Sequence, residues 1–191
     1  MARSATDWLA RRGWSWSRCR PTTDRESPVG HGLDMSATPS LKAIRANLYE
    51  SIYEPFLVIE GKRLPAPTSD REREYITGHD ETSGGVQRFR LCLHGQKLSA
   101  AVVVRYVQCG DVSDWLTTIN GGITDLSTTE KDKSCSWSKK DHLGNLKNDG
   151  KAKASRCDSQ HGRTGGLPDV RLTHLWICFP TKAKLPKKKS A

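Results

Sequence analysis

Apolar positions at helical spacing stand out first, in the stretch that begins after Met35. An apolar side chain recurs every three or four residues there, at Leu41, Ile44, Leu48 and Ile52. This spacing places the four side chains on one face of an α-helix. Pro39 suits a first helical turn, and Pro55 stops the run because proline cannot donate the helical hydrogen bond. The pattern therefore predicts an amphipathic helix between Ser36 and Pro55.

Several later segments have the composition of β-strands. Residues 56–59 form a short apolar run that ends before Gly61, and residues 170–179 are again largely apolar. Residues 86–93 alternate between apolar and polar side chains, and residues 98–107 include three consecutive valines. Alternation and β-branched residues are typical of strands. With the turn residues between them, the segments 86–93 and 98–107 predict a β-hairpin.

Other segments lack a clear period. Residues 62–85 are polar and contain two prolines, which indicates an exposed excursion or a short charged helix. Residues 111–119 are compatible with a short helix or a strand, and residues 120–122, Asn-Gly-Gly, predict a turn. Residues 127–169 are rich in Ser, Lys, Asp, Asn and Gly, so we expect a flexible basic loop there.

These elements predict an α+β fold with one small mixed domain. We expect an N-terminal helix packed on an antiparallel sheet of about four short strands, with disordered arms. The predicted parts are a disordered Arg/Trp-rich arm (1–34), a helix-plus-sheet core (35–126), a flexible basic loop (127–169), a strand returning to the core (170–180) and a Lys-rich tail (181–191). Hydrophobic residues make up 35% of the chain, below the roughly 45–50% apolar content of ordinary globular chains, which indicates a modest core.

The positive charge is confined to the last third of the sequence. The chain of 191 residues has a formal net charge of +10. Residues 1–130 hold 16 Lys and Arg against 16 Asp and Glu, whereas residues 131–191 hold 15 against 5, and 12 of those 15 are Lys. A localised positive field attracts polyanions such as nucleic acid, anionic lipid or an acidic protein. The same residues also suit a solubilising tail.

The leading functional prediction is a non-enzymatic protein that binds nucleic acid through this Lys-rich C-terminal third. Lysines contact phosphates, and Trp137 adds an aromatic face for a base or a lipid interface. A lysine array cannot by itself supply bidentate base readout, so we expect sequence-tolerant, salt-sensitive binding. The predicted nucleic-acid or polyanion site comprises Lys131, Lys133, Trp137, Lys139, Lys140, Lys147, Lys151, Lys153, Arg156, Lys182, Lys184, Lys187, Lys188 and Lys189.

Other interpretations of the same charge stay open. One is a peripheral membrane or assembly protein of the viral-matrix kind, in which the Arg/Trp arm and the Lys tail both lie on anionic lipid. The run from Pro186 to Lys189 also resembles part of a nuclear-import signal, which would make importin a partner. Further alternatives are an enzyme that uses Cys or His, and a lineage-restricted protein without a defined activity.

The sequence carries few signals of location. It has no secretory signal, no N-x-S/T sequon and no apolar run near the ~20 residues that a transmembrane segment needs. Its six cysteines are scattered, which favours reduced thiols over a disulfide framework. We therefore expect an intracellular protein of the nucleus or cytoplasm. The Arg-rich, acid-poor start also has the composition of a mitochondrial presequence, which is an alternative location.

Candidate chemistry is sparse. Three glycine pairs lack the context of a phosphate-binding loop, and no GxSxG or HExxH motif occurs. The pairs Cys157/His161 and His174/Cys178 faintly resemble the ligand spacing of a zinc module. On a strand, however, His174 and Cys178 would lie about 13 Å apart, too far to share one Zn²⁺. We therefore predict no catalytic residue, no metal site and no cofactor.

Overall fold

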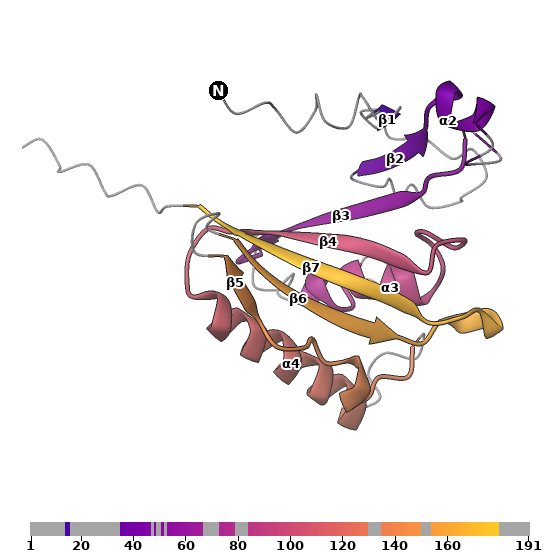
Figure 1. The fold of residues 1–191 in the computed structure, drawn as a ribbon. Coiled ribbons are helices and arrows are strands. Elements are labelled where there is room, and N and C mark those ends of the chain that lie inside the picture. Colours follow the sequence, from indigo (N-terminus) through magenta and orange to yellow (C-terminus); the bar gives the residue numbers. More distant parts are fainter. Residues whose placement is uncertain are drawn as a thin grey trace, which may run out of the picture.

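The computed structural model shows one mixed sheet with helices packed beneath it (Figure 1). The structure describes residues 14–15, 35–46, 48, 51, 53–66, 73–78, 84–129, 135–149 and 154–179. The strands are β1 (Trp14–Ser15), β2 (Met35–Pro39), β3 (Leu57–Leu64), β4 (Ala100–Val107), β5 (Lys147–Asp149), β6 (Ala154–His161) and β7 (Val170–Cys178). The helices are α2 (Leu41–Arg45), α3 (Gly85–Arg90) and α4 (Val112–Thr129), with the 3-10 turns η2 (Lys139–Asp141) and η3 (Thr164–Gly166).

The centre of the sheet is parallel and its flanks are antiparallel. The strand order is β1-β2-β3-β4-β7-β6-β5. Strand β4 pairs in parallel with β3 on one side and with β7 on the other. The remaining strands pair antiparallel. Parallel neighbours need a crossover connection, and the segments that contain α3 and α4 supply it. The expected antiparallel sheet of about four strands is therefore wrong, although the fold does mix helices with strands.

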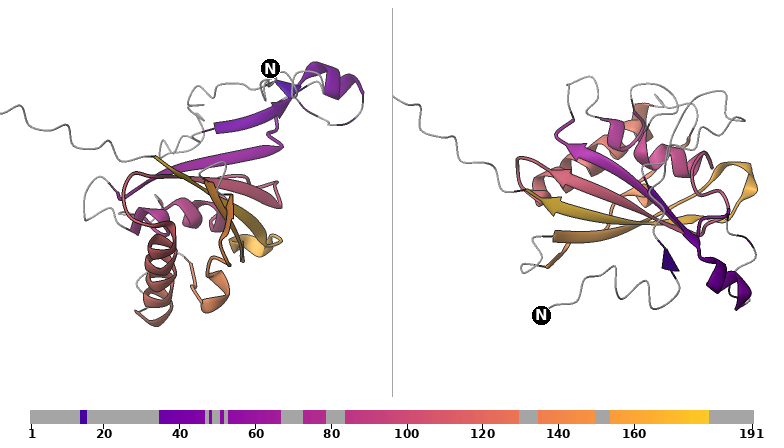
Figure 2. Two further views of the ribbon diagram at one scale, coloured as in Figure 1. Left: turned by 60° about the vertical axis from the view of Figure 1, so that its left-hand side comes forward. Right: turned by 90° about the horizontal axis from the view of Figure 1, so that it is seen from above.

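Helices α3 and α4 cover the same face of the sheet (Figure 2). Alternate side chains of β4, β6 and β7 point toward them. On β4 these are the buried residues Ala101, Val103, Arg105 and Val107. The apolar core joins strand residues to helix residues, among them Val58, Val103, Leu172, Trp176, Phe89, Ile119 and Ile123. No described helix covers the opposite face.

A buried ion cluster fixes α3 to β3. Glu60 Oε1 on β3 lies 3.0 Å from Lys62 Nζ and 3.1 Å from Arg88 Nη1 on α3. Burial acts to raise the pKa of Glu60, but the His94 imidazole, whose Nδ1 lies 3.4 Å from Oε2, and the charge of Lys62 hold that pKa below its ordinary value. The carboxylate therefore stays ionised inside the core and bridges the helix to the strand.

The predicted N-terminal helix is wrong. Residues Met35–Pro39 form β2 and pair with β3, and the helix that follows spans only Leu41–Arg45. Two members of the expected apolar stripe, Leu41 and Leu48, are 60% and 65% exposed. Pairing with β3 uses the residues that would begin the helix, so tertiary contacts override the local periodicity.

The predicted hairpin is also wrong, because its first arm is helix α3. Val86, Phe89 and Arg90 are buried in α3. Their spacings of three and four residues from Val86 place them on one face of a helix, so the sequence of this segment fits a helix as well as an alternating strand. The second arm is a strand, β4, but its partners are parallel. A hairpin needs antiparallel arms, whereas α3 carries the chain across to a parallel position.

Residues 120–122, predicted as a turn, lie inside α4. Ile119, Ile123 and Leu126 are buried on one side of this helix. Gly122 permits a close approach, because a Cβ atom there would lie 2.9 Å from Ile76 Cδ1. Packing of the apolar side thus maintains the helix through two glycines that disfavour it locally.

The C-terminal third contains more regular structure than expected. The segment 127–169, expected to be a flexible loop, includes the end of α4, η2, β5, β6 and η3 in its described part. The predicted strand at 170–179 is confirmed as β7, and the strand predicted at 56–59 is confirmed within β3, which continues past Gly61. The tail at 181–191, and the arm at 1–34 apart from β1, lie outside the described residues.

Candidate nucleic-acid interface

The face of the sheet that no described helix covers carries exposed cations and exposed aromatic rings. We name it the open face and define it by two groups of outward-pointing residues. The basic group comprises Lys147, Arg156 and Arg171, and the apolar group comprises Val104, Tyr106, Leu175 and Phe179. Within the strands, both groups alternate with buried positions. They therefore lie on the side away from α3 and α4.

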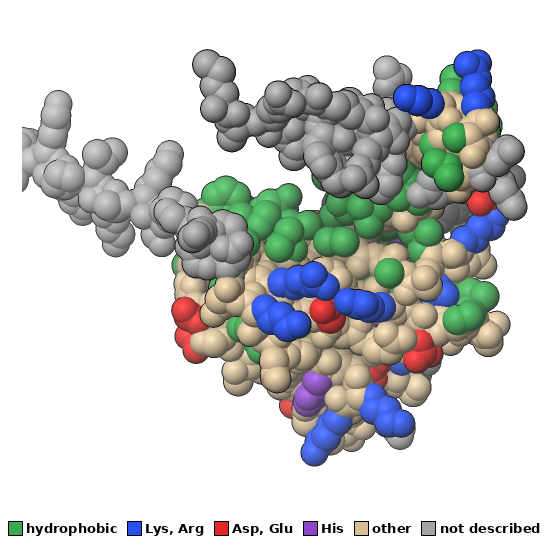
Figure 3. Space-filling model, in the orientation of Figure 1, with side chains coloured by type: hydrophobic (Ala, Val, Ile, Leu, Met, Phe, Trp, Pro, Cys, Tyr) green, Lys and Arg blue, Asp and Glu red, His purple; other side chains and the backbone are tan. Residues whose placement is uncertain are grey.

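The basic group spans three neighbouring strands. Lys147 on β5 lies directly opposite Arg156 on β6. Asp158 Oδ1 lies 3.1 Å from Arg156 Nη2 and 3.6 Å from Arg171 Nη2. Since two arginines share one carboxylate and Lys147 adds a third cation, this group keeps a net positive charge. Figure 3 shows Lys and Arg side chains gathered around an acidic one, beside an apolar area.

Asp158 positions the two arginines. Its Oδ1 atom accepts a hydrogen bond from the Thr173 hydroxyl at 2.7 Å. Partial burial acts to raise the pKa of Asp158, but the Thr173 hydroxyl and the Arg156 guanidinium lower that pKa below its ordinary value. The side chains of Arg156 and Arg171 are still 49% and 56% exposed. Their guanidinium groups can therefore meet an anion from solvent without leaving Asp158.

Tyr106 and Phe179 form the aromatic part of the open face. Their ring centroids lie 6.0 Å apart with the planes tilted by 40°, and the residues are 40% and 52% exposed. Arg63, also exposed, lies beside Tyr106 on β3. A groove of about 470 Å³ next to Tyr106 reaches across Val104 and Ile59. Exposed rings beside cations offer a base a stacking surface and its phosphate a partner.

The sequence-predicted lysines do not all belong to this face. Lys147 and Arg156 lie on it, as described above. Lys139 and Lys140 are exposed on η2. Turn η2 packs against the covered face of β6, because its Asp141 contacts the buried His161. The remaining predicted residues lie outside the described part of the chain: Lys131, Lys133, Lys151, Lys153, Lys182, Lys184, Lys187, Lys188 and Lys189.

Trp137 does not present its ring to solvent. The residue is only 7% exposed, and the guanidinium carbon of Arg90 lies 4.4 Å above its ring. The same guanidinium donates to the backbone oxygens of Ser136 at 2.6 Å and Gly162 at 3.1 Å. Trp137 therefore packs in the core, and the exposed rings of the open face are Tyr106 and Phe179.

Sequence reasoning missed the ring pair Tyr106 and Phe179, the cation Arg171, and the neighbouring Arg63 on β3. Alternation within the predicted strand 98–107 already places Tyr106 on the opposite side from Arg105. The sequence does not indicate which of the two sides the helices cover. The exposed side is known only once α3 and α4 are placed.

A chain of hydrogen bonds links buried polar groups beneath the helices. Tyr75 bonds to His174 Nδ1, and Ser159 Oγ lies 2.7 Å from both His174 Nε2 and His161 Nε2. His161 Nδ1 lies 3.1 Å from Asp141 Oδ1. One proton order satisfies the whole chain if each group donates to the next and both imidazoles are neutral. Burial lowers the pKa of both histidines, in accord with that order.

The described cysteines and histidines show no arrangement suited to a metal. Within the described ranges, no group of three or more His, Cys, Asp or Glu side chains could hold a metal ion. The five described cysteines are thiols: Cys92, Cys109, Cys135, Cys157 and Cys178. Burial raises the pKa of Cys157 to about 11. A thiol with that pKa is a poor nucleophile at neutral pH, because little thiolate is present.

Comparison of the chain with protein-family models, with curated proteins and with solved structures found no match. Among the helices that the structure describes, none has both the length and the apolar character needed to cross a membrane.

Proposed function

We propose that the protein binds single-stranded nucleic acid on the open face of its sheet, without reading a defined sequence. The observation that carries this proposal is the presence of the Tyr106–Phe179 ring pair and the Arg156–Arg171 cation group on one face that no described helix covers. Proteins that bind single strands combine cations that follow the phosphates with rings on which bases stack.

A single strand suits this face better than a duplex does. The bases of a duplex are stacked on one another, so they cannot also stack on Tyr106 or Phe179. An unpaired strand exposes both the face of each base and the phosphate beside it. On the open face Arg63 lies beside Tyr106, and the basic group lies further along the same face, which suits a strand that alternates charge with aromatic surface.

The lysines of the C-terminal third have a supporting role in this proposal. They add positive charge that raises affinity for any polyanion without discriminating between sequences. The run at residues 186–189 extends the proposal to import into the nucleus through importin. A location in the nucleus or cytoplasm is part of the proposal.

The test is fluorescence anisotropy of a labelled single-stranded RNA with the full-length chain at low and high salt. Affinity should fall steeply with salt. Arg156→Gln should reduce the slope of log K against log salt by about 0.7, because the variant neutralises one phosphate fewer. Tyr106→Ala should weaken binding by about fivefold or more, because stacking contributes about 1–3 kcal/mol per base.

Two controls separate this site from general charge attraction. Arg45→Gln removes an exposed cation on α2. In this background Tyr106→Ala should weaken binding by the same factor as in the parent chain. Vesicles of anionic lipid, added as competitor, test the membrane interpretation directly. Binding that is insensitive to Tyr106→Ala, or that vesicles displace completely, would contradict the proposal.

A further inference from the structure

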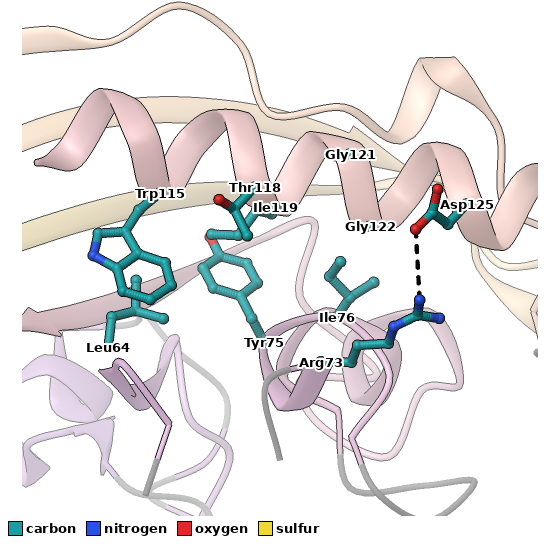
Figure 4. A pocket seen from close by; sticks show the side chains of 10 residues that line it. All are labelled: Leu64, Arg73, Tyr75, Ile76, Trp115, Thr118, Ile119, Gly121, Gly122 and Asp125. Atoms are coloured by element: carbon teal, nitrogen blue, oxygen red, sulfur yellow. Dashed lines mark ion pairs between the residues drawn. The ribbon is translucent and has the colours of Figure 1, made fainter. Parts of the chain in front are cut away.

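A separate cavity lies at the carboxyl ends of β3 and β4, between α4 and residues 73–78 (Figure 4). Its volume is about 320 Å³, at the lower end of the range of about 300–1,000 Å³ found for small-molecule sites. The carboxyl ends of parallel strands are where open α/β sheets bind ligands. The cavity lies on the helix side of the sheet, so it is distinct from the open face.

The walls of the cavity are largely apolar and are held in place. Leu64, Ile76 and Ile119 contribute aliphatic surface, and Trp115 and Tyr75 contribute rings. The Trp115 indole N–H donates to the Cys109 carbonyl oxygen at 2.8 Å, and the Tyr75 hydroxyl is bonded to buried His174. Rings fixed by such bonds lose little freedom when a ligand enters, which favours an aromatic or aliphatic group.

A glycine leaves the cavity open on the side of α4. Gly122 has a packing role, since a Cβ atom there would collide with Ile76. Gly121 also lines the cavity, but a Cβ atom there would meet nothing within 4 Å. Gly121 is exposed, so the absence of a side chain there serves no close packing, and a larger side chain can be placed at the edge of the cavity.

The polar part of the cavity is a pair of opposite charges. Arg73 Nη2 lies 3.5 Å from Asp125 Oδ2, and the two side chains are 43% and 62% exposed. Figure 4 shows this pair on the opposite side of Ile76 from Trp115. An exposed ion pair contributes little to stability, so a ligand can replace each partner at small cost. Because the two charges cancel, neither a simple anion nor a simple cation is favoured.

We propose that this cavity binds a free α-amino acid with an aromatic or large aliphatic side chain. Its carboxylate would pair with Arg73 and its ammonium with Asp125, while the side chain lies among Ile76, Trp115 and Ile119. The two ligand charges are attached to the same carbon atom, which suits protein charges that lie 3.5 Å apart. This inference is independent of the nucleic-acid proposal, because it uses none of the residues of the open face.

Three related probes test the charge pairing by calorimetry on the full-length chain. They are L-phenylalanine, N-acetyl-L-phenylalanine, which lacks the ammonium, and L-phenylalaninamide, which lacks the carboxylate. L-phenylalanine should bind about tenfold more tightly than either derivative, because each derivative lacks one of the two charge-assisted hydrogen bonds. Arg73→Gln should weaken binding of L-phenylalanine and N-acetyl-L-phenylalanine, which carry the carboxylate, and leave the affinity for L-phenylalaninamide unchanged. Asp125→Asn should weaken binding of L-phenylalanine and L-phenylalaninamide, which carry the ammonium, and leave the affinity for N-acetyl-L-phenylalanine unchanged.

Gly121→Leu tests the location of the site. Leucine forms helix readily, and the open space at this position accepts its side chain at the edge of the cavity, so the variant should fold and bind the three probes more weakly. Gly121→Ala is the matched control and should retain binding, with thermal unfolding confirming that both variants are folded. An affinity that Gly121→Leu leaves unchanged would overturn the proposal. So would equal affinity for all three probes, or preference for the amide, which would indicate the amino terminus of a peptide.

Discussion

The Nδ1 atom of His161 lies 3.1 Å from the Oδ1 atom of Asp141, and both side chains are buried where η2 packs on β6. Burial lowers the pKa of His161, although the Asp141 carboxylate opposes that shift. His174, in the same hydrogen-bonded chain, has a pKa well below its ordinary value because it is buried and faces Arg105. Both imidazoles are therefore neutral in the folded chain.

This relationship predicts loss of stability in mild acid. Histidines of the unfolded chain titrate near about pH 6.5, so below that pH the unfolded chain binds more protons than the folded chain. The free energy of unfolding should therefore fall as the pH drops from 7 to 5, by up to about 1.4 kcal/mol per pH unit for each histidine. Urea unfolding at several pH values measures it. His161→Asn should make the dependence shallower, and a flat profile in the parent chain would contradict the assignment.

A second prediction concerns Arg90, which lies 3.4 Å from Asp141 and stacks on Trp137. Arg90→Ala leaves the buried carboxylate without its cation and should destabilise the chain by about 3–5 kcal/mol. Urea unfolding followed by tryptophan fluorescence gives the change. Arg90→Lys keeps the charge but not the paired backbone hydrogen bonds. Its free energy of unfolding should therefore lie between those of the parent chain and Arg90→Ala. If Arg90→Ala lowers the free energy of unfolding by less than about 1 kcal/mol, the Asp141 carboxylate does not depend on the Arg90 cation, which would contradict this prediction.

The two glycines of α4 provide a matched comparison. Gly121→Ala should stabilise the chain by about 0.5–1 kcal/mol, since alanine favours a helix and its Cβ atom meets nothing within 4 Å. Gly122→Ala gains the same propensity but forces its Cβ atom to 2.9 Å from Ile76 Cδ1. It should therefore stabilise the chain less than Gly121→Ala, or destabilise it. Thermal unfolding of both variants under one condition compares them, and equal melting temperatures would argue against the close approach.

Thiol reactivity provides a fourth prediction. Cys109 is exposed, whereas Cys157 is buried with its pKa raised to about 11. Maleimide should label Cys109 within minutes at pH 7, while Cys157 should react only as fast as the chain opens, because thiolate and access are both required. Mass spectrometry of timed samples locates each label. Unfolding the chain in urea serves as the control, since it exposes Cys157 and should make the labelling rates of Cys109 and Cys157 similar.

Some elements were predictable because one local signal decided them. Strand β7 follows from its run of β-branched and apolar residues, and packing reinforces that preference. Helix α4 was hidden because the two glycines at 121 and 122 are a local turn signal, whereas the buried side chains of Ile119 and Ile123 stabilise the helix. Strand β6 was hidden because small polar residues such as Ser155 and Ser159 occupy its buried positions. Ser155 bonds to Asn148 on β5, and Ser159 bonds to His174 on β7 and to His161 on β6 itself.

The candidate site was predictable in its charge but not in its composition. An excess of cations after residue 130 is visible in the sequence, and Lys147 and Arg156 belong to the open face. Trp137 could not be assigned correctly, because the guanidinium that covers it comes from Arg90, far away in the chain. Tyr106 and Phe179 required the sheet order, which alone places the ends of β4 and β7 side by side.

The position of β7 affects the order in which the chain can fold during synthesis. This strand follows every other described strand in the sequence, yet it lies between β4 and β6 in the sheet. Until residues 170–178 leave the ribosome, β4 and β6 each present a row of unpaired backbone groups. Such edges are prone to pair with other chains. A nascent chain of this protein is thus exposed to aggregation until residues 170–178 have emerged, and closure of the sheet by β7 ends that exposure.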